Sequence, residues 1–380
     1  MEVCRQRRQQ GHSIPRLSTL AAKRASREAS WRPRTRDSTS TSSSLQPRRY
    51  REVKCVVIVA IDIGATWTRV AVFEQRRMLA KKVFGTAGGE KLLERMVEAV
   101  LELVDRGSID AIGVGTIGPL DIRRGAIVKS PNIGGKTIEL GKPLAKALGT
   151  PTYIVNDCVA AVWGEYVYGI GSENLVYITL STGVGGGAIV DGHLLLGRHG
   201  NAHEIGHMVV DVTGFMECGC GGRGHWEAYA GGANIPKFAK KLVQVWAEKN
   251  PNIKRHKFYQ SVLEGVTVEK LYQTARQGDK LARAIVDEIN RYNVVGFTTT
   301  TNVYDPDTIA VGGSIALNNK DLVLEPIARA VRESRDLVTA PPKILPATFG
   351  HEAVLYGAAA IAEEPPKHLL KAIEYNTNNT

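Results

Sequence analysis

Apolar residues along the chain fall into continuous β-branched runs and into stretches with helical spacing. The run Cys55–Ile63 predicts a buried strand, and a second strand, Thr68–Phe73, follows the turn at Gly64-Ala65-Thr66. Further strands are expected over Ala111–Thr116, Thr152–Val155, Leu175–Leu180, Ala188–Val190 and Thr308–Val311. Helices are expected over Lys91–Val104, Cys158–Tyr168, Ile235–Trp246, Val268–Thr301 and Ala353–Ala362. Strands that alternate with helices indicate an α/β fold.

The opening pattern of strand, glycine turn and returning strand occurs twice. It surrounds Gly64, and it recurs where Leu175–Leu180 is followed by Ser181-Thr182-Gly183-Val184-Gly185-Gly186-Gly187. Aligning Gly64 with Gly183 superposes the two copies. An internal repeat of this kind is more informative than either copy alone.

The composition is that of a soluble protein large enough for two domains. The chain has 380 residues, of which 43% are hydrophobic and 23% are charged. It lacks an apolar run near the roughly 20 residues of a membrane span. Its five cysteines are few and unevenly spaced, so a disulfide framework is not expected and a cytoplasmic location fits.

The net charge of +11 is concentrated at the N-terminus. Residues 1–50 hold twelve Arg or Lys and three acids, so the remainder is nearly neutral. Residues 1–52 are rich in Arg and Ser and lack apolar periodicity, which predicts a disordered tail. Three interpretations stay open: a transit peptide, a weak nucleic-acid contact, or a start codon assigned too far upstream. The abrupt onset of foldable sequence near Val53 favours the last.

A dense cluster of metal-binding residue types lies between His203 and Glu227. Thiolates and imidazoles at this density suit zinc, and the candidate ligands are His207, Cys218, Cys220 and His225. His203-Glu204-x-x-His207 also matches the zinc-protease pattern, which requires a stable helix. Gly206 lies inside the motif and a short strand, Met208–Asp211, is expected after it, so a protease is the weaker interpretation.

The two glycine turns suit phosphate groups. Each presents backbone N–H groups and Thr or Ser hydroxyls, and Asp62 at the end of the first strand is an oxygen donor suited to hydrated Mg²⁺. For either turn taken alone, the alternative is an ordinary glycine-rich hairpin turn that binds no phosphate. A third glycine pair, Gly312-Gly313, follows a later strand and favours a nucleotide site. The P-loop pattern is absent from the sequence.

These motifs resemble those of the sugar kinase/actin/Hsp70 superfamily. Asp62–Thr68 is similar to its first phosphate motif, Leu180–Gly187 to the second, and Thr308–Ser314 to the adenosine motif. The Glu-x-Gly-His and Cys-x-Cys-Gly-x-x-Gly-x-x-Glu elements resemble the ROK family (repressors, open reading frames, kinases). Gly115–Asp121 and Ser130–Ile133 fit the same family. The resemblance extends from about Val53 to Ala362.

The resemblance implies two actin-like (RNase H-like) α/β domains with a cleft between them. Residues 53–155, joined by helix 353–363, would form the smaller domain and residues 156–352 the larger, followed by a C-terminal tail at 364–380. It also implies an ATP- and Mg²⁺-dependent hexokinase acting on glucose, as a monomer or homodimer. A membrane partner is not expected, and neither is nucleic acid. Another hexose or an N-acetylated amino sugar is the alternative substrate, and a sugar-responsive repressor the alternative class.

The resemblance assigns roles to individual residues. Asp157 would be the catalytic base, whereas the residues alone favour a helix N-cap at this position. The sugar would be bound by Asn132, Asn156, Asp157, Glu204, His207 and Glu227. ATP and Mg²⁺ would be bound by Asp62, Gly64, Thr66, Thr68, Thr182, Gly183, Gly185, Gly312 and Gly313. A structural zinc would be held by His207, Cys218, Cys220 and His225, although the family normally has Cys at the position of His225.

Overall fold

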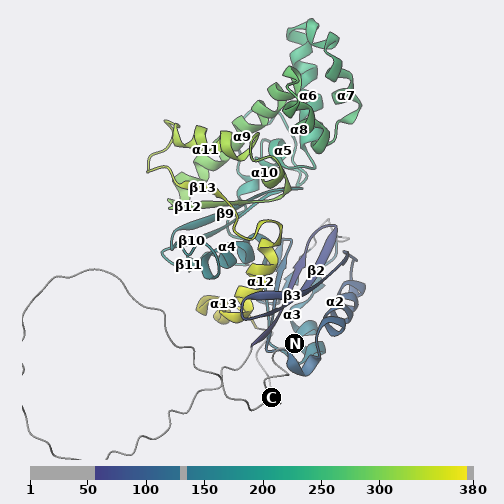
Figure 1. Cartoon of the computed structure of the whole chain (residues 1–380), viewed down its shortest axis with the longest axis vertical. Coiled ribbons are helices and arrows are strands. Elements are labelled where there is room, and N and C mark those ends of the chain that lie inside the picture. Colours follow the sequence, from purple (N-terminus) through teal and green to yellow (C-terminus); the bar gives the residue numbers. More distant parts are fainter. Residues whose placement is uncertain (1–55, 129–134, 375–380) are drawn as a thin grey trace, which may run out of the picture. The chain divides into compact units, whose positions relative to one another are not determined.

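The protein contains two five-stranded sheets with the same internal strand order. The computed structural model describes residues 56–128 and 135–374. In the first sheet the order is β3-β2-β1-β4-β8, formed by β1 (Val57–Ile63), β2 (Trp67–Glu74), β3 (Arg77–Gly85), β4 (Ala111–Thr116) and β8 (Thr152–Asn156) (Figure 1). In the second the order is β11-β10-β9-β12-β13, formed by β9 (Leu175–Leu180), β10 (Val184–Val190), β11 (His193–Leu194), β12 (Thr308–Gly312) and β13 (Lys343–Pro346).

The two sheets pair their strands in the same way, which confirms the repeat. In each, the first strand is antiparallel to the second across a glycine turn and parallel to the strand on its other side. A smaller sheet of β5 (Leu120–Asp121), β6 (Ala126–Ile127) and β7 (Ile138–Glu139) follows β4. Strands β4 and β12 are buried along their whole length and β1 is buried after Val57, as expected for parallel strands covered on both faces.

Helices cover both faces of each sheet. On the first sheet, α2 (Glu90–Leu103) and α3 (Gly141–Leu148) contribute to one core, and α12 (Ala353–Glu363) packs on the other face. On the second sheet, α4 (Asp157–Val167) packs against β9 and β10. The opposite face meets a helical core that includes α5 (Glu227–Ala230), α6 (Ile235–Lys249), α7 (Lys257–Gly265), α8 (Val268–Arg276), α9 (Lys280–Tyr304), α10 (Ser314–Asn318) and α11 (Leu324–Arg332).

Helices α4 and α12 cross at a contact between two glycines. A methyl group added at Gly164 would lie 2.8 Å from the Cα of Gly357, and one added at Gly357 would collide with the carbonyl of Ala160. The absence of side chains therefore lets the two helix backbones touch. Because α12 packs on the first sheet and α4 on the second, this crossing joins the two halves of the repeat.

Three expectations from the sequence differ from the structure. The helix expected over Val268–Thr301 is two helices, because Gly278 adopts φ 90° and the Asp279 side chain then accepts hydrogen bonds from the first N–H groups of α9. The strand expected over Met208–Asp211 is only a single bridge from Val209 to His225. The expected C-terminal tail includes the short helix α13 (Lys367–Ala372).

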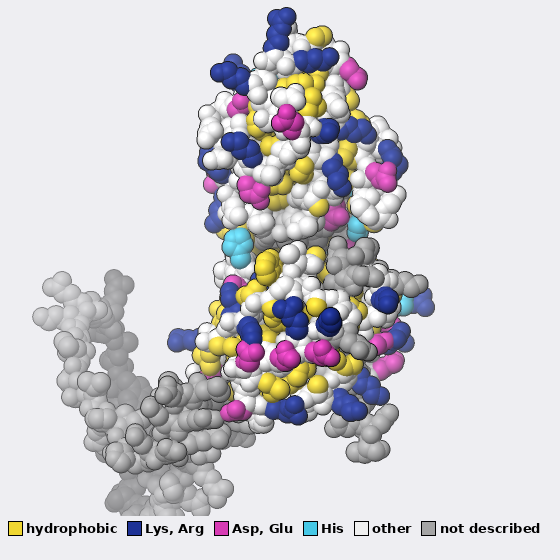
Figure 2. Space-filling model, turned by 90° about the vertical axis from the view of Figure 1, so that its right-hand side faces the viewer, with side chains coloured by type: hydrophobic (Ala, Val, Ile, Leu, Met, Phe, Trp, Pro, Cys, Tyr) yellow, Lys and Arg dark blue, Asp and Glu magenta, His cyan; other side chains and the backbone are white. Residues whose placement is uncertain are grey.

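Charge is mixed rather than segregated on the face shown in Figure 2, where Lys and Arg side chains interleave with Asp and Glu. Among the helices that the structure describes, none is long and apolar enough to cross a membrane. The expected tail at residues 1–52 lies outside the described residues.

The helix crossing gives a stability prediction. Gly357→Ala places a methyl group against the Ala160 carbonyl, so we expect a loss of about 1–3 kcal/mol in the free energy of unfolding. Gly107→Ala is the matched control, because a methyl group there meets nothing within 4 Å. Chemical denaturation of both variants checks this, and equal stabilities would contradict the crossing.

Candidate active site

Asp157 begins α4 at the carboxyl end of β8, and its neighbour Asn156 caps the helix. Asn156 Oδ1 accepts hydrogen bonds from the N–H groups of Cys158 (2.9 Å) and Val159 (3.4 Å). Asp157 Oδ1 accepts from Cys158 N at 2.8 Å. The N-cap expected as the alternative role of Asp157 thus belongs to Asn156, and the Asp157 carboxylate is held by both the N–H and the side chain of Cys158.

Glycines on β10 and β4 hold the first turn of α4 close to both sheets. A methyl group at Gly187 would collide with the carbonyl of Cys158, and one at Gly185 would lie 2.8 Å from the Cys158 sulfur. On the other side, a methyl group at Gly115 would lie 3.6 Å from the Cα of Asp157. Gly187 therefore lets the backbone of α4 approach β10, and the predicted site residue Gly185 leaves room for the Cys158 side chain.

Burial raises the pKa of Asp157 to about 6. The N–H of Cys158 opposes this shift, and the negative charge of Glu204 adds to it. Burial likewise raises the pKa of Asp62 to about 6, against the effect of Arg69. Two carboxyl groups with raised pKa values near glycine turns are a feature of catalytic sites more often than of purely structural ones.

The first glycine turn is fixed by its own backbone and by Thr86. Gly64 N donates to Trp67 O at 3.0 Å, and the Thr86 hydroxyl donates to Gly64 O at 2.8 Å. Thr68 is fully buried and its hydroxyl lies 2.9 Å from that of Thr86, whereas Thr66 is exposed at the tip.

Asp62 forms an ion pair at the end of β1. Its Oδ2 lies 2.6 Å from Nη1 of Arg69, the residue opposite it on β2. The carboxylate is an oxygen donor of the kind Mg²⁺ prefers, so its chemistry fits the expected metal, and here it is partnered by a guanidinium.

The second glycine turn lies beside the third glycine pair because β9 and β12 are neighbours. Gly313 has φ 86°, and a methyl group there would collide with the carbonyl of Leu180. The Ser181 and Ser314 hydroxyl oxygens are 3.4 Å apart. Thr182 is exposed at the tip of this turn, as Thr66 is in the first.

Polar side chains from two segments converge on Gly118. A methyl group there would lie 3.6 Å from Asn201 Oδ1, 3.7 Å from Glu204 Oε1 and 3.8 Å from Asn156 Nδ2. Asn201 also bonds both the N–H (2.8 Å) and the C=O (2.7 Å) of Leu120. Sequence reasoning missed Asn201, since an asparagine in a glycine-rich loop carries no signal of its own. Asn132, expected at the sugar, lies outside the described residues.

The four predicted zinc ligands come together. One ligand atom from each of His207, Cys218, Cys220 and His225 lies within 4.8 Å of the others. Cys218 Sγ lies 3.9 Å from His207 Nδ1, and Cys220 Sγ lies 3.3 Å from His225 Nδ1. Zinc bond lengths of 2.0–2.3 Å in a tetrahedron separate ligand atoms by about 3.3–3.8 Å, close to these two distances, and two thiols with two imidazoles are a donor set that suits zinc.

His207 joins this cluster to Glu204. Its Nδ1 faces Cys218, while its Nε2 lies 3.8 Å from Glu204 Oε2. One ring nitrogen is thus available to a metal and the other to the polar cluster.

His203 takes no part in the cluster. Its buried ring lies 2.8 Å from Gly186 O and 2.6 Å from Leu195 O, one carbonyl for each nitrogen. Residues Ile205–His207 form a single 3₁₀ turn. The helical geometry of the zinc-protease motif is therefore absent from this segment.

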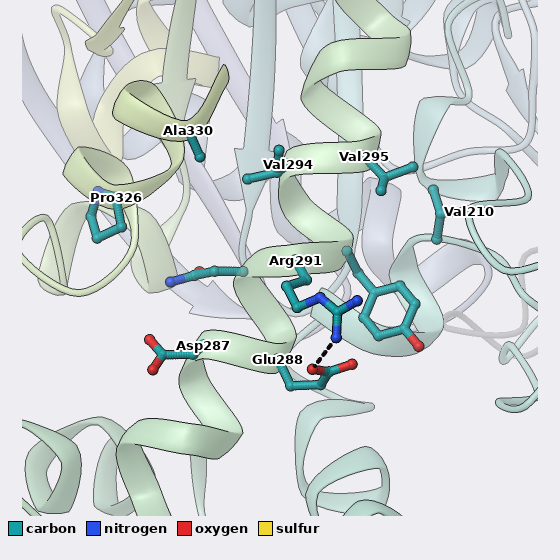
Figure 3. A pocket seen from close by; sticks show the side chains of 10 residues that line it. Val210, Asp287, Glu288, Arg291, Val294, Val295, Pro326 and Ala330 are labelled. Atoms are coloured by element: carbon teal, nitrogen blue, oxygen red, sulfur yellow. Dashed lines mark hydrogen bonds and ion pairs between the residues drawn. The ribbon is translucent and has the colours of Figure 1, made fainter. Parts of the chain in front are cut away.

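A pocket on the helical side of the second sheet lies away from these residues. It has a volume of about 540 Å³ and is lined by α9 and α11 together with Val210, with Arg291 and Glu288 paired at 2.9 Å along α9 (Figure 3). None of the predicted site residues lines it.

Comparisons with known proteins agree on one family. The ROK family profile matches residues 58–365. A glucokinase from Pyrobaculum calidifontis is 40% identical over 313 residues, which cover 82% of this chain and 97% of that protein. The ROK hexokinase from Thermus thermophilus has 33% identity and a TM-score of 0.67, covering 81% of this chain and 98% of its own.

A third relative was crystallised with ligands. It is a ROK family glucokinase from Streptomyces griseus in complex with glucose and AMPPNP, with 31% identity and a TM-score of 0.64 over 82% of this chain and 99% of its own. The family profile spans most of the chain, and the relatives of this chain are matched over nearly their full length. This protein therefore belongs to the ROK family.

Proposed function

We propose that this protein is an ATP-dependent hexokinase that phosphorylates glucose at its 6-hydroxyl. The observation that carries the proposal is the convergence of Asn156, Asn201 and Glu204 on Gly118, directly beside Asp157. Relatives at 40% and 31% identity are named glucokinases, and the second was crystallised with glucose and an ATP analogue.

Asp157 would act as general base. A primary hydroxyl loses its proton as it attacks phosphorus, and a carboxylate at hydrogen-bond distance accepts that proton. The N–H of Cys158 holds one carboxylate oxygen at 2.8 Å and so orients the carboxylate. The rest of phosphoryl transfer depends on alignment and charge neutralisation.

The sugar would lie against Gly118, where a side chain would occupy its space. Asn156 uses its oxygen to cap α4, which leaves its Nδ2 to donate to a sugar hydroxyl. Glu204 would accept from sugar hydroxyls, and His207 Nε2 would act beside it.

The two glycine turns would bind the phosphates of ATP, and Gly312-Gly313 would lie against the adenosine. Asp62 would hold hydrated Mg²⁺, which would supply charge neutralisation to the phosphates. Zinc at His207, Cys218, Cys220 and His225 would be structural, since it has four protein ligands and would orient the loop between Glu204 and Glu227.

We further propose that residues 53–155 with helix 353–363 form one domain and residues 156–352 the other. Packing of α12 on β1 and β4 supports this division. Closure of such domains would exclude water that otherwise hydrolyses ATP. The unpaired thiols of Cys218 and Cys220 suit a reducing cytoplasm.

Coupled ADP release tests the proposal. The purified protein is assayed with ATP and Mg²⁺ across glucose, mannose, fructose, N-acetylglucosamine and N-acetylmannosamine. Polyphosphate is then tested as donor by following formation of the sugar phosphate, because this donor releases no ADP. We expect the highest kcat/KM with glucose and ATP. Absence of sugar-dependent ADP release would refute a kinase, and a higher kcat/KM for an amino sugar would change the substrate.

Asp157→Asn tests the base. The change keeps the shape of the side chain and removes its basicity, so we expect kcat to fall by about 10²–10⁴. Burial raises the pKa of Asp157 to about 6, so above that pH the folded protein carries a buried carboxylate charge that lowers its stability. The variant lacks this charge and should be at least as thermally stable as the wild type at neutral pH. A variant that keeps most of its kcat would remove Asp157 from this role.

The pH dependence of kcat/KM should show an acidic limb near pH 6. The base acts only when ionised, so activity is full above the pKa of Asp157, which is about 6, and declines below it. The charged and polar groups that influence the pKa of Asp157 are the Cys158 N–H and the carboxyls of Glu204 and Asp62. Glu204→Gln removes one negative charge and should move the limb to lower pH. A profile that stays flat between about pH 7 and pH 5 would contradict the assignment.

Metal analysis tests the zinc site. Protein purified without a histidine tag should contain about one zinc per chain, and Cys218→Ser/Cys220→Ser should lose it together with thermal stability. His225→Cys, which restores the usual ROK residue, should keep it. Glu217→Gln, in the same loop and exposed, is the control. Unchanged zinc content in the double serine variant would exclude these ligands.

A further inference from the structure

The carboxylate of Glu227 lies on the second glycine turn. Its Oε2 accepts a hydrogen bond from Val184 N at 3.0 Å. A methyl group added at Gly183 would collide with the same oxygen. A negative charge therefore covers the turn that, under the proposed function, receives the phosphates of ATP.

The segment that carries Glu227 also bonds the rest of this turn. Gly232 N donates to Ser181 O at 2.8 Å, and Ala233 N donates to Thr182 O at 3.0 Å. The start of α5 is fixed separately, because the fully buried Trp226 donates through Nε1 to Asn293 Oδ1 at 2.9 Å. The backbone of Glu227 is thus held in place, and its side chain is the part that can reorient.

The other carboxylate oxygen, Oε1, lies 3.8 Å from Cys218 Sγ. Burial raises the pKa of Glu204 and the negative charge of Glu227 adds to this shift, so the two carboxylates are close enough to interact. Glu227 therefore stands between the residues that would hold the sugar and the turn that would hold the nucleotide.

Two effects at the turn oppose a bound nucleotide while Glu227 stays there. The carboxylate repels the negatively charged phosphate oxygens. It also occupies the N–H of Val184, a donor of the kind that phosphate-binding turns use. A sugar hydroxyl that donates to Glu227 would weaken both effects, because it draws the charge toward the sugar.

We propose that Glu227 couples the two substrate sites, so that sugar binding releases the second glycine turn and strengthens nucleotide binding. The inference rests on the proposed function, which places a hexose beside Glu204 and nucleotide phosphates at the turn. Coupling between binding sites is reciprocal, so the nucleotide strengthens sugar binding by the same factor.

Calorimetry with Mg²⁺ and AMPPNP, a non-hydrolysable ATP analogue, tests the coupling. In the absence of sugar, Glu227→Gln should bind AMPPNP about five-fold more tightly than the wild type or better, since it keeps the shape of the side chain without its charge. Saturating glucose should tighten AMPPNP binding to the wild type by about five-fold or more, and this gain should shrink in Glu227→Gln.

Glu204→Gln is the matched control. It removes a carboxylate of the same cluster that has no described hydrogen bond to the glycine turn, so its affinity for AMPPNP without sugar should equal that of the wild type. Thermal melting and zinc content confirm that both variants are folded. The proposal would be overturned if Glu227→Gln, without sugar, bound AMPPNP no more tightly than the wild type. It would also be overturned if glucose increased the affinity for AMPPNP by the same factor in Glu227→Gln and in Glu204→Gln.

If Glu227→Gln does not fold, the effect of glucose on AMPPNP binding to the wild type still tests the coupling. Failure of glucose to tighten AMPPNP binding would then overturn the coupling. Failure of the proposed function is a separate result, seen as absence of sugar-dependent ADP release, whereas the sugar-free affinities depend only on the charge at the turn.

Discussion

The structure depends on how closely the backbone of α4 approaches its neighbours. Gly187 lets its first turn touch β10, and the crossing of Gly164 with Gly357 brings α12 against it. Side chains at these positions would push the helix outward and take Asp157 with it. Close packing tolerates little displacement, and a shift of about 1 Å at a reacting group can cost a hundred-fold in rate. These glycines thus link the fold directly to the position of the proposed base.

The two halves of the repeat have equivalent glycine turns, but different charged side chains lie beside them. In the first half, Asp62 at the end of β1 is paired with Arg69. In the second, the turn is covered by Glu227, which follows the cluster of His207, Cys218, Cys220 and His225 in the sequence. The family resemblance assigns the same sugar-binding role to Glu204 and Glu227. Their contacts in the structure differ, because only Glu227 has a described hydrogen bond to the glycine turn.

Features fixed by local sequence could be predicted, and those made by distant contacts could not. The buried strands and glycine turns are local, and so is the spacing of His207, Cys218, Cys220 and His225, which the structure brings together as expected. Strand β3 was missed because it is an edge strand with Leu79 and Val83 exposed. The break at Gly278 was hidden within an otherwise helical pattern. The convergence of Asn201 on Gly118 and of Glu227 on Val184 joins residues far apart in sequence, so no local pattern indicates it.

A crystal structure with glucose, Mg²⁺ and AMPPNP tests the central claim most directly, namely that Asp157 and the cluster at Gly118 form a hexose phosphorylation site. The account predicts glucose against Gly118, its 6-hydroxyl oxygen at hydrogen-bond distance from Asp157, and the γ-phosphate in line beyond it. Glucose bound elsewhere, or seated with another hydroxyl facing Asp157, would contradict the account.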